Sequence, residues 1–208
     1  HKGQTTKDKP QRTNDKGQTT KDKGQTTLSI KEMWTNLLQP NLVLGKPVVH
    51  LSAKILKEHQ LEGLILDVDE TLVPLRSRQA SDELIAWIGE IRQVAKIWLV
   101  SNNLSENRIG TIANSLNLPY IIGARKPSRK SLRQAAAGMG LPVHKIAMVG
   151  DRVFTDVLAG NRLQMFTILV EPMADPAIVD RSYPVRRLEV QISQWLGVNI
   201  QGKDQNFS

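Results

Sequence analysis

The sequence predicts an α/β fold of three layers, in which helices cover both faces of a central parallel sheet. From residue 63 onward, short apolar runs alternate with segments of helical periodicity, an order that is typical of βαβ units. The predicted strands are almost wholly apolar rather than alternating, as expected for strands that are buried on both faces. At 208 residues the chain is long enough for one such domain of ordinary size.

Five strands and four helices are predicted in alternation. The strands are expected at residues 63–68, 97–100, 120–122, 146–149 and 166–170. The helices are expected at residues 82–94, 105–117, 129–139 and 155–163. A final amphipathic helix that packs on the core is predicted around Leu188, Ile192, Trp195 and Leu196. Ligands of such sheets bind beyond the carboxyl ends of the strands, where the strand order reverses, so functional residues are expected there.

The chain divides into four predicted parts. Residues 1–27 repeat a polar seven-residue unit with no apolar position, which predicts a disordered tail. Residues 28–60 are predicted as an N-terminal helical segment, with one apolar stripe formed by Ile30, Met33, Trp34, Leu37 and Leu38. This stripe either packs on the core or lies in a membrane interface. The main domain is expected at 61–198 and a C-terminal tail at 199–208.

The composition of the chain limits where the protein can be located and what it can bind. The chain has no cysteine, which excludes disulfides and thiolate metal sites. No apolar run approaches the roughly 18 residues that span a bilayer, and the first residues lack the apolar stretch of a signal peptide. We expect a cytoplasmic protein, soluble or peripheral on the inner membrane face. Half of the net charge of +8 lies in residues 1–27, and the rest suits nucleic acid, anionic membrane, a phosphorylated ligand or plain solvated surface.

Two carboxylates stand at the end of the first predicted strand. Asp67 and Asp69 are two residues apart, so both side chains point to the same side of the chain. Two buried carboxylates are unfavourable unless a cation or a proton compensates them, which indicates a bound metal or acid/base chemistry. Thr71 could donate a hydrogen bond in the turn and fix the pair. An ordinary Asp-rich turn is the alternative interpretation.

Three further polar motifs follow later strands. Ser101 and Asn102 could donate to phosphate oxygens, and Lys126 immediately precedes a helix whose free N–H groups would add to phosphate attraction. Asp151 and Asp156 add two carboxylates at another strand end. Taken singly, these residues also fit polar loops or surface positions. Four carboxylates in one crevice make an oxygen-rich site that suits Mg²⁺.

Together these motifs resemble the haloacid dehalogenase (HAD) superfamily of aspartate-nucleophile phosphatases. The DxDxT pattern of Asp67, Asp69 and Thr71 is followed in order by Ser101, Lys126 and the GDxxxxD pattern that contains Asp151 and Asp156. The stretches DVDETLVPL, VSNN, GARKPSRK, GDRVFTDVLAGNRL and TILVEP look like the class IIIA branch, with its YqeG-like proteins and phosphatidylglycerophosphate phosphatases. The likeness runs from about Trp34 to Leu196. It implies a HAD-like Rossmannoid α/β/α fold.

The resemblance also implies a role for each motif residue. Asp67 would attack phosphorus to form an aspartyl phosphate, and Asp69 would protonate the leaving alkoxide and later activate water. Phosphate would be bound by Thr71, Ser101, Asn102 and Lys126. Mg²⁺ would be held by Asp67, Asp151 and the backbone carbonyl of Asp69, with Asp156 supporting a metal-bound water or Lys126.

The predicted site is open to solvent, so it could admit a bulky or membrane-held substrate. Residues 74–96 and 105–125 leave little room for the cap domain that many relatives carry, so a minimal cap or none is expected. A basic cluster on the crevice side would attract a doubly phosphorylated headgroup or an anionic bilayer: Arg76, Arg78, Arg108, Arg125, Arg129, Lys130, Arg152 and Arg162. We therefore expect conversion of phosphatidylglycerophosphate to phosphatidylglycerol, with peripheral membrane contact.

Several alternatives remain open at this point. Each arginine could serve an ordinary surface ion pair. The substrate could be another bulky phosphate, such as a phosphoprotein or a nucleic-acid end, although nucleic acid is the less favoured partner. A non-catalytic phosphate-binding scaffold is a third reading. A nucleotide-binding module is disfavoured because no GxxxxGK[ST] or GxGxxG follows a strand. The sequence leaves the oligomeric state open.

Overall fold

The computed structural model describes residues 29–75, 77–173, 191 and 197–200. The predicted disordered tail at 1–27 and most of the predicted tail at 199–208 lie outside these residues. The predicted final helix also lies outside them, because Leu188, Ile192, Trp195 and Leu196 are not described.

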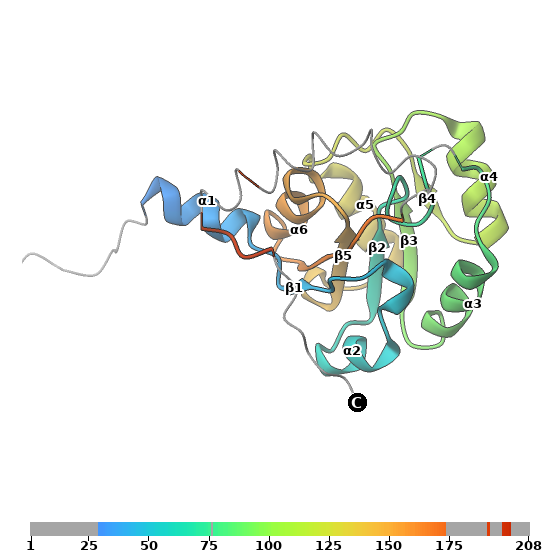
Figure 1. Cartoon of the computed structure of the whole chain (residues 1–208), viewed down its shortest axis with the longest axis horizontal. Coiled ribbons are helices and arrows are strands. Elements are labelled where there is room, and N and C mark those ends of the chain that lie inside the picture. Colours follow the sequence, from blue (N-terminus) through green and yellow to red (C-terminus); the bar gives the residue numbers. More distant parts are fainter. Residues whose placement is uncertain (1–28, 76, 174–190, 192–196, 201–208) are drawn as a thin grey trace, which may run out of the picture.

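A six-stranded parallel sheet forms the centre of the protein (Figure 1), in the order β1-β6-β5-β2-β3-β4. The strands are β1 (Leu42–Val43), β2 (Gly63–Leu66), β3 (Lys96–Val100), β4 (Tyr120–Ile121), β5 (Ile146–Gly150) and β6 (Phe166–Leu169). All five pairings are parallel, which confirms the predicted fold class. The sequence missed β1, because two residues are too short to show a strand period. β1 extends the sheet beyond β6.

Helices connect the strands as predicted, with small shifts at their ends. The elements are α1 (Ile30–Leu38), α2 (Ala53–Glu58), α3 (Asp82–Ile91), α4 (Glu106–Leu116), α5 (Lys130–Met139) and α6 (Leu158–Asn161). The hydroxyls of Ser81 and Ser105 cap α3 and α4, because each accepts a hydrogen bond from the backbone N–H three residues later in the chain. The described residues after β2 and β3 contain α3, α4 and β4 but no cap domain.

The predicted helix at 155–163 has a different start from the one expected. The chain enters it at Val153 through a widened, π-helical turn, Val153–Val157, and α6 follows. Such single wide turns insert one residue into a helix and are frequent at functional sites. Hydrophobic periodicity over so short a stretch does not reveal them, so the sequence could not place this turn.

The core lies in two layers on opposite faces of the sheet. In β2, Leu64 and Leu66 pack in the cluster that contains the buried residues of α2, α3 and α4. Between them, Ile65 packs in the cluster that contains the buried apolar residues of α5 and Ala159 of α6. This alternation follows from the two-residue repeat of a strand. Helices therefore cover both faces, which confirms the three-layer arrangement.

The predicted N-terminal segment 28–60 shares this core. Its residues Val48, Leu51 and Leu56 are fully buried in the same cluster as β2. The indole nitrogen of Trp87 in α3 donates to the Leu51 carbonyl at 2.8 Å, which joins the segment to the helical layer. The boundary at residue 60 stays a prediction, and packing does not mark it.

The apolar stripe of α1 is divided between core and solvent. At its C-terminal end Leu38 is buried with Val153 and Val157. At its N-terminal end Ile30 and Trp34 remain 75% and 40% exposed. Among the described residues, none of the helices combines the length and apolar character needed to cross a membrane.

Gly160 in α6 provides a test of the packing between the helices and the sheet. A Cβ atom at this position would lie 2.5 Å from Thr167 Cγ2 and 3.0 Å from Met148 Cβ. We predict that Gly160→Ala lowers the free energy of unfolding by about 1–3 kcal/mol, because the neighbours are strand residues that cannot move away. Chemical denaturation measures this change.

Gly89→Ala is the matched control, since Gly89 lies in α3 with no atom near an added Cβ. This variant should be more stable than the wild type by roughly 0.5–1 kcal/mol, from reduced backbone entropy. Equal effects of the two substitutions would contradict the close approach of α6 to the sheet.

Candidate active site

Three strands end side by side at the centre of the sheet, and each is followed at once by a predicted site residue. β2 pairs with β3 on one side and β5 on the other. Asp67 follows β2, Ser101 follows β3 and Asp151 follows β5. The chain builds β3 and β4 on one side of β2 and β5 and β6 on the other, so the strand order reverses here. This is the place where parallel sheets bind ligands.

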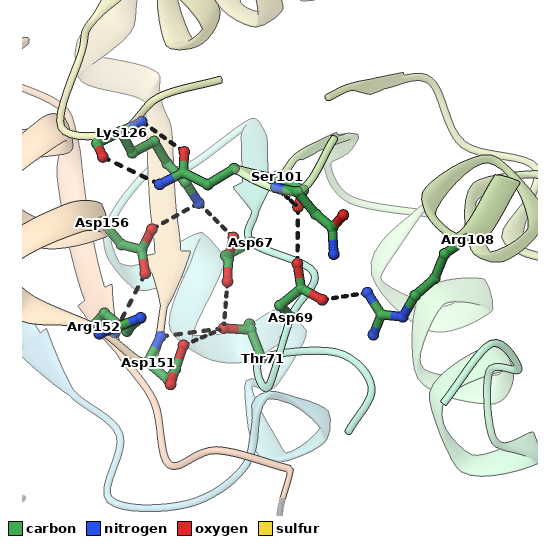
Figure 2. A network of polar contacts seen from close by, with 11 residues as sticks. Asp67, Asp69, Thr71, Ser101, Arg108, Lys126, Asp151, Arg152 and Asp156 are labelled. Carbon is green, nitrogen blue, oxygen red and sulfur yellow. Dashed lines mark hydrogen bonds and ion pairs between the residues drawn. The ribbon is translucent and has the colours of Figure 1, made fainter. Parts of the chain in front are cut away.

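A buried lysine lies between two carboxylates (Figure 2). Lys126 Nζ is 2.5 Å from Asp67 Oδ1 and 2.7 Å from Asp156 Oδ1. All three residues are at most 6% exposed. Gly150 makes room for the arrangement, since an added Cβ there would lie 2.7 Å from Asp156 Cβ. The structure thus brings together residues from the loop after β2, from the segment before α5 and from the wide turn after β5.

Asn102 holds the backbone of this lysine. Its Oδ1 accepts from the Lys126 N–H at 2.6 Å, and its Nδ2 donates to the Lys126 carbonyl at 3.1 Å. The structure therefore gives Asn102 a positioning role, and its predicted contact with phosphate stays a prediction. The two bonds join the loop after β3 to the segment that carries Lys126.

Thr71 joins the ends of β2 and β5. Its Oγ1 donates to Asp151 Oδ1 at 3.0 Å, accepts from the Asp151 N–H at 3.2 Å and lies 3.4 Å from Asp67 Oδ2. A tight turn with Glu70 at a positive φ of 63° brings the hydroxyl back over the strand end. The structure differs from the expectation that Thr71 fixes Asp67 and Asp69, since its partners are Asp67 and Asp151.

Asp69 is held by two other groups. The hydroxyl of Ser101 donates to its Oδ2 at 3.0 Å, and Arg108 Nη1 forms an ion pair with its Oδ1. The Asp69 side chain keeps 20% of its surface exposed, more than the 9% of Asp67. Asp69 is therefore the more accessible carboxylate at the mouth of the site.

Arg108 is the site residue that sequence reasoning did not single out. The sequence placed it in a basic cluster at the rim, yet it is only 7% exposed and contacts Asp69 directly. Its position three residues after the α4 cap, Ser105, directs the side chain back toward the strand ends, and this was the available signal. Of the rest of that cluster, Arg78, Arg125, Lys130 and Arg162 are exposed, Arg129 and Arg152 are half-buried, and Arg76 lies outside the described residues.

Burial dominates the electrostatics of the site. It raises the pKa of Asp67 to about 7, against the opposing effect of Lys126 and with support from the negative charge of Asp156. Burial also raises the pKa of Asp151 well above its usual range, with further contributions from Asp156 and Asp67. For Lys126 burial acts to lower the pKa, but the charges of Asp156 and Asp67 outweigh it and the pKa is raised. The lysine is therefore charged at neutral pH.

The donor set fits a hard divalent cation. Asp67, Asp151 and Asp156 each offer one oxygen, and these oxygens lie within 4.8 Å of one another. With Asp69 the site has four carboxylates, against the two cations Lys126 and Arg108, which leaves two uncompensated negative charges if all ionise. A divalent cation would neutralise this excess and lower the raised carboxyl pKa values.

Comparison with known proteins places the chain in a family. A family model described as HAD-hydrolase-like matches residues 123–172. A protein of Bacillus subtilis (strain 168) named "Probable phosphatase YqeG" is 38% identical over 130 residues, which are 62% of this chain and 75% of that protein. The chain belongs to the YqeG-like phosphatases of the HAD superfamily. This membership confirms the resemblance that the four motifs indicated.

More distant similarities to this YqeG-like phosphatase are found among named proteins and among solved structures. The Arabidopsis thaliana protein named "Phosphatidylglycerophosphate phosphatase 1, chloroplastic/mitochondrial" is 25% identical over 175 residues, which are 78% of this chain but only 49% of that protein. Among solved structures, a HAD family enzyme of Bacteroides thetaiotaomicron in a magnesium complex is 10% identical, with a TM-score of 0.44. The match covers 59% of this chain and 100% of that chain.

The buried lysine yields a prediction about stability. We predict that Lys126→Met lowers the free energy of unfolding by about 3–5 kcal/mol near pH 8 without divalent cations, because it leaves two buried carboxylates without their counter-charge. Lys145→Met is the control, since Lys145 forms an exposed ion pair with Glu62 at 2.6 Å and should contribute at most about 1 kcal/mol. Similar losses for the two variants in urea denaturation would contradict the structural importance of Lys126.

The raised pKa of Asp67 yields a prediction about pH. The folded state holds this proton up to about pH 7, whereas an unfolded aspartate releases it near pH 4. The folded state therefore binds more protons in that window, and the stability that protonation supplies is lost as pH rises through it. Without divalent cations, the unfolding free energy of the wild type should fall relative to that of Asp67→Asn as the pH rises from about 4 to 7. A constant difference would contradict the raised pKa.

Proposed function

We propose that this phosphatase hydrolyses phosphomonoesters with the help of Mg²⁺, through an aspartyl phosphate on Asp67. The observation that carries the proposal is the Asp67 carboxylate itself, held by Lys126 at 2.5 Å beside Asp151 and Asp156. A nucleophilic carboxylate needs an opposite charge next to it, since it must approach an anionic phosphate. Lys126 supplies such a charge, and the cluster of oxygens suits a metal ion.

The chain's own residues account for the two chemical steps. An Asp67 oxygen forms a bond to phosphorus, and the bond from phosphorus to the leaving oxygen breaks as Asp69 gives that oxygen a proton. Asp69 then takes a proton from a water molecule, whose oxygen attacks the phosphorus and frees Asp67. Ser101 lies next to Asp69 and Lys126 lies next to Asp67, so both can bind oxygens of a phosphoryl group that is attacked by Asp67. Bound Mg²⁺ would supply further charge neutralisation for the transferring phosphoryl group.

We further propose phosphatidylglycerophosphate as the substrate and phosphatidylglycerol as the product. The support is the name of the Arabidopsis relative, together with the lack of a cap domain in the described residues after β2 and β3. An uncapped site admits a headgroup whose acyl chains stay in a bilayer. The exposed arginines on the loops after β2 and β4, Arg78 and Arg125, suit its second, diester phosphate.

The nucleophile is tested by substitution. Asp67→Asn should abolish turnover of any phosphomonoester while the protein stays folded, because the amide is neutral and a much weaker nucleophile. Asp82→Asn, on the exposed start of α3, is the control and should keep wild-type turnover. Phosphate release in Mg²⁺ measures both variants. Activity of Asp67→Asn within about tenfold of wild type, or roughly 1.4 kcal/mol in barrier, would contradict the assignment.

The substrate is tested by comparison. Purified protein is assayed with phosphatidylglycerophosphate in mixed micelles, soluble sugar phosphates, p-nitrophenyl phosphate, a phosphopeptide and an oligonucleotide with a terminal phosphate, each with and without Mg²⁺. We expect the highest kcat/KM for the lipid and activity only with the metal. A preference for any of the other esters would overturn the lipid assignment and leave the nucleophile test unaffected.

A further inference from the structure

Two of the most exposed apolar side chains in the described part of the protein lie at the mouth of the site. Leu104 is 77% exposed and Leu75 is 55% exposed. Single exposed leucines are common on protein surfaces and need no explanation. These two, however, stand on the two loops that follow the strand ends carrying Ser101 and Asp67, so they share one edge of the sheet.

Leu104 lies over the segment that leads to Lys126. A Cβ atom added to Gly123 would be 2.8 Å from Leu104 Cδ2, so the leucine side chain covers this glycine. The Gly123 N–H donates to the Asn103 carbonyl at 2.9 Å, and the Ala124 N–H donates to the Ser101 carbonyl at 3.0 Å. Two backbone hydrogen bonds therefore join the loop that carries Leu104 to the loop that leads to Lys126, and they fix the position of Leu104.

Arg108 fixes the loop of Leu75 to the same edge. Its Nη2 donates to the Pro74 carbonyl at 3.2 Å and its Nε to the Ser77 carbonyl at 2.9 Å, on either side of Leu75. The same guanidinium reaches Asp69 (Figure 2). Its backbone N–H donates to Ser105, the residue after Leu104. One buried arginine thus connects both leucine loops to the catalytic carboxylate.

Exposed cations accompany the leucines on this edge. Arg78 follows the Leu75 loop, Arg125 precedes Lys126, and Lys130 begins α5. Three exposed acidic residues at the same edge interact locally: Asp82 and Glu83 lie in the first turn of α3, at the positive end of its dipole, and Glu106 accepts from the Tyr120 hydroxyl at 2.7 Å. The edge therefore combines apolar side chains with basic ones, which is the composition that binds an anionic lipid interface.

We propose that Leu75 and Leu104, with Arg78 and Arg125, form a docking rim that inserts into the surface of an anionic bilayer. The leucines enter the acyl boundary, the arginines stay at the headgroups, and the site opens toward the lipid phosphates. This surface differs from the exposed end of α1, which the sequence offered as a membrane contact. The inference deepens the proposed function and rests on its lipid substrate.

Vesicle sedimentation of the full chain tests the rim. The probes are vesicles of phosphatidylcholine with about one third phosphatidylglycerol, and vesicles of phosphatidylcholine alone. We expect wild type to bind the anionic vesicles, to bind the neutral ones at least about tenfold more weakly, and to lose affinity as salt rises. The double variant Leu75→Ser/Leu104→Ser should bind the anionic vesicles at least about tenfold more weakly than wild type.

Two control variants locate the binding surface. Ile85→Ser removes a 45% exposed residue from α3 and should bind as wild type does. Met33→Ser/Trp34→Ser removes the exposed face of α1 and should also retain most of the binding. Loss of binding in the α1 variant with retention in the leucine variant would overturn the docking rim, as would equal loss in all variants or no binding by wild type.

Activity on a soluble ester separates this inference from the proposed chemistry. The leucine variant should hydrolyse p-nitrophenyl phosphate at the wild-type rate, because neither leucine contacts the reacting groups. It should be slower than wild type only with phosphatidylglycerophosphate presented in vesicles. Equal loss on both substrates would show that the leucines support the fold of the site and would overturn the rim. Failure of Asp67→Asn to abolish turnover would instead overturn the chemistry and leave the vesicle result standing.

Discussion

The site depends on one buried cation, the ammonium group of Lys126 between Asp67 and Asp156. Three carboxylates gathered at two strand ends repel one another, and burial makes that repulsion stronger than it would be in water. A lysine at 2.5 and 2.7 Å compensates part of the charge but not all of it. Burial, together with the remaining excess of negative charge, raises the pKa of Asp67 and Asp151, and this excess suits a divalent cation.

Hydrogen bonds from the surrounding polar residues hold the segments that carry this charged cluster in place. Asn102 fixes the backbone of Lys126, and Thr71 ties the end of β2 to the end of β5. Each of these bonds joins two segments that are far apart in sequence. A buried lysine has several rotatable bonds, so its charge is useful only if the backbone that carries it is placed accurately. The hydrogen bonds therefore matter for position more than for their own energy.

Arg108 connects the inner chemistry to the outer edge of the site. It contacts the more exposed of the paired aspartates and holds the loop of Leu75 by two backbone carbonyls. The inside of the site is polar and charged, whereas the rim carries apolar side chains. This arrangement suits a substrate whose reactive group is anionic and whose remainder is apolar, and it links the proposed substrate with the proposed docking surface.

The sequence by itself determined the parallel α/β architecture, the positions of Asp67, Ser101, Lys126 and Asp151 after their strands, and the family. These features follow from local patterns, since buried strands read as apolar runs and motif residues follow them directly. Only the tertiary structure decided which groups meet. The pairing of Arg108 with Asp69, the use of Asn102 to hold Lys126, the wide turn under Asp156 and the edge strand β1 all depend on contacts between distant segments. No local periodicity records such contacts, because their energies arise only when separate strand ends are brought to one edge of the sheet.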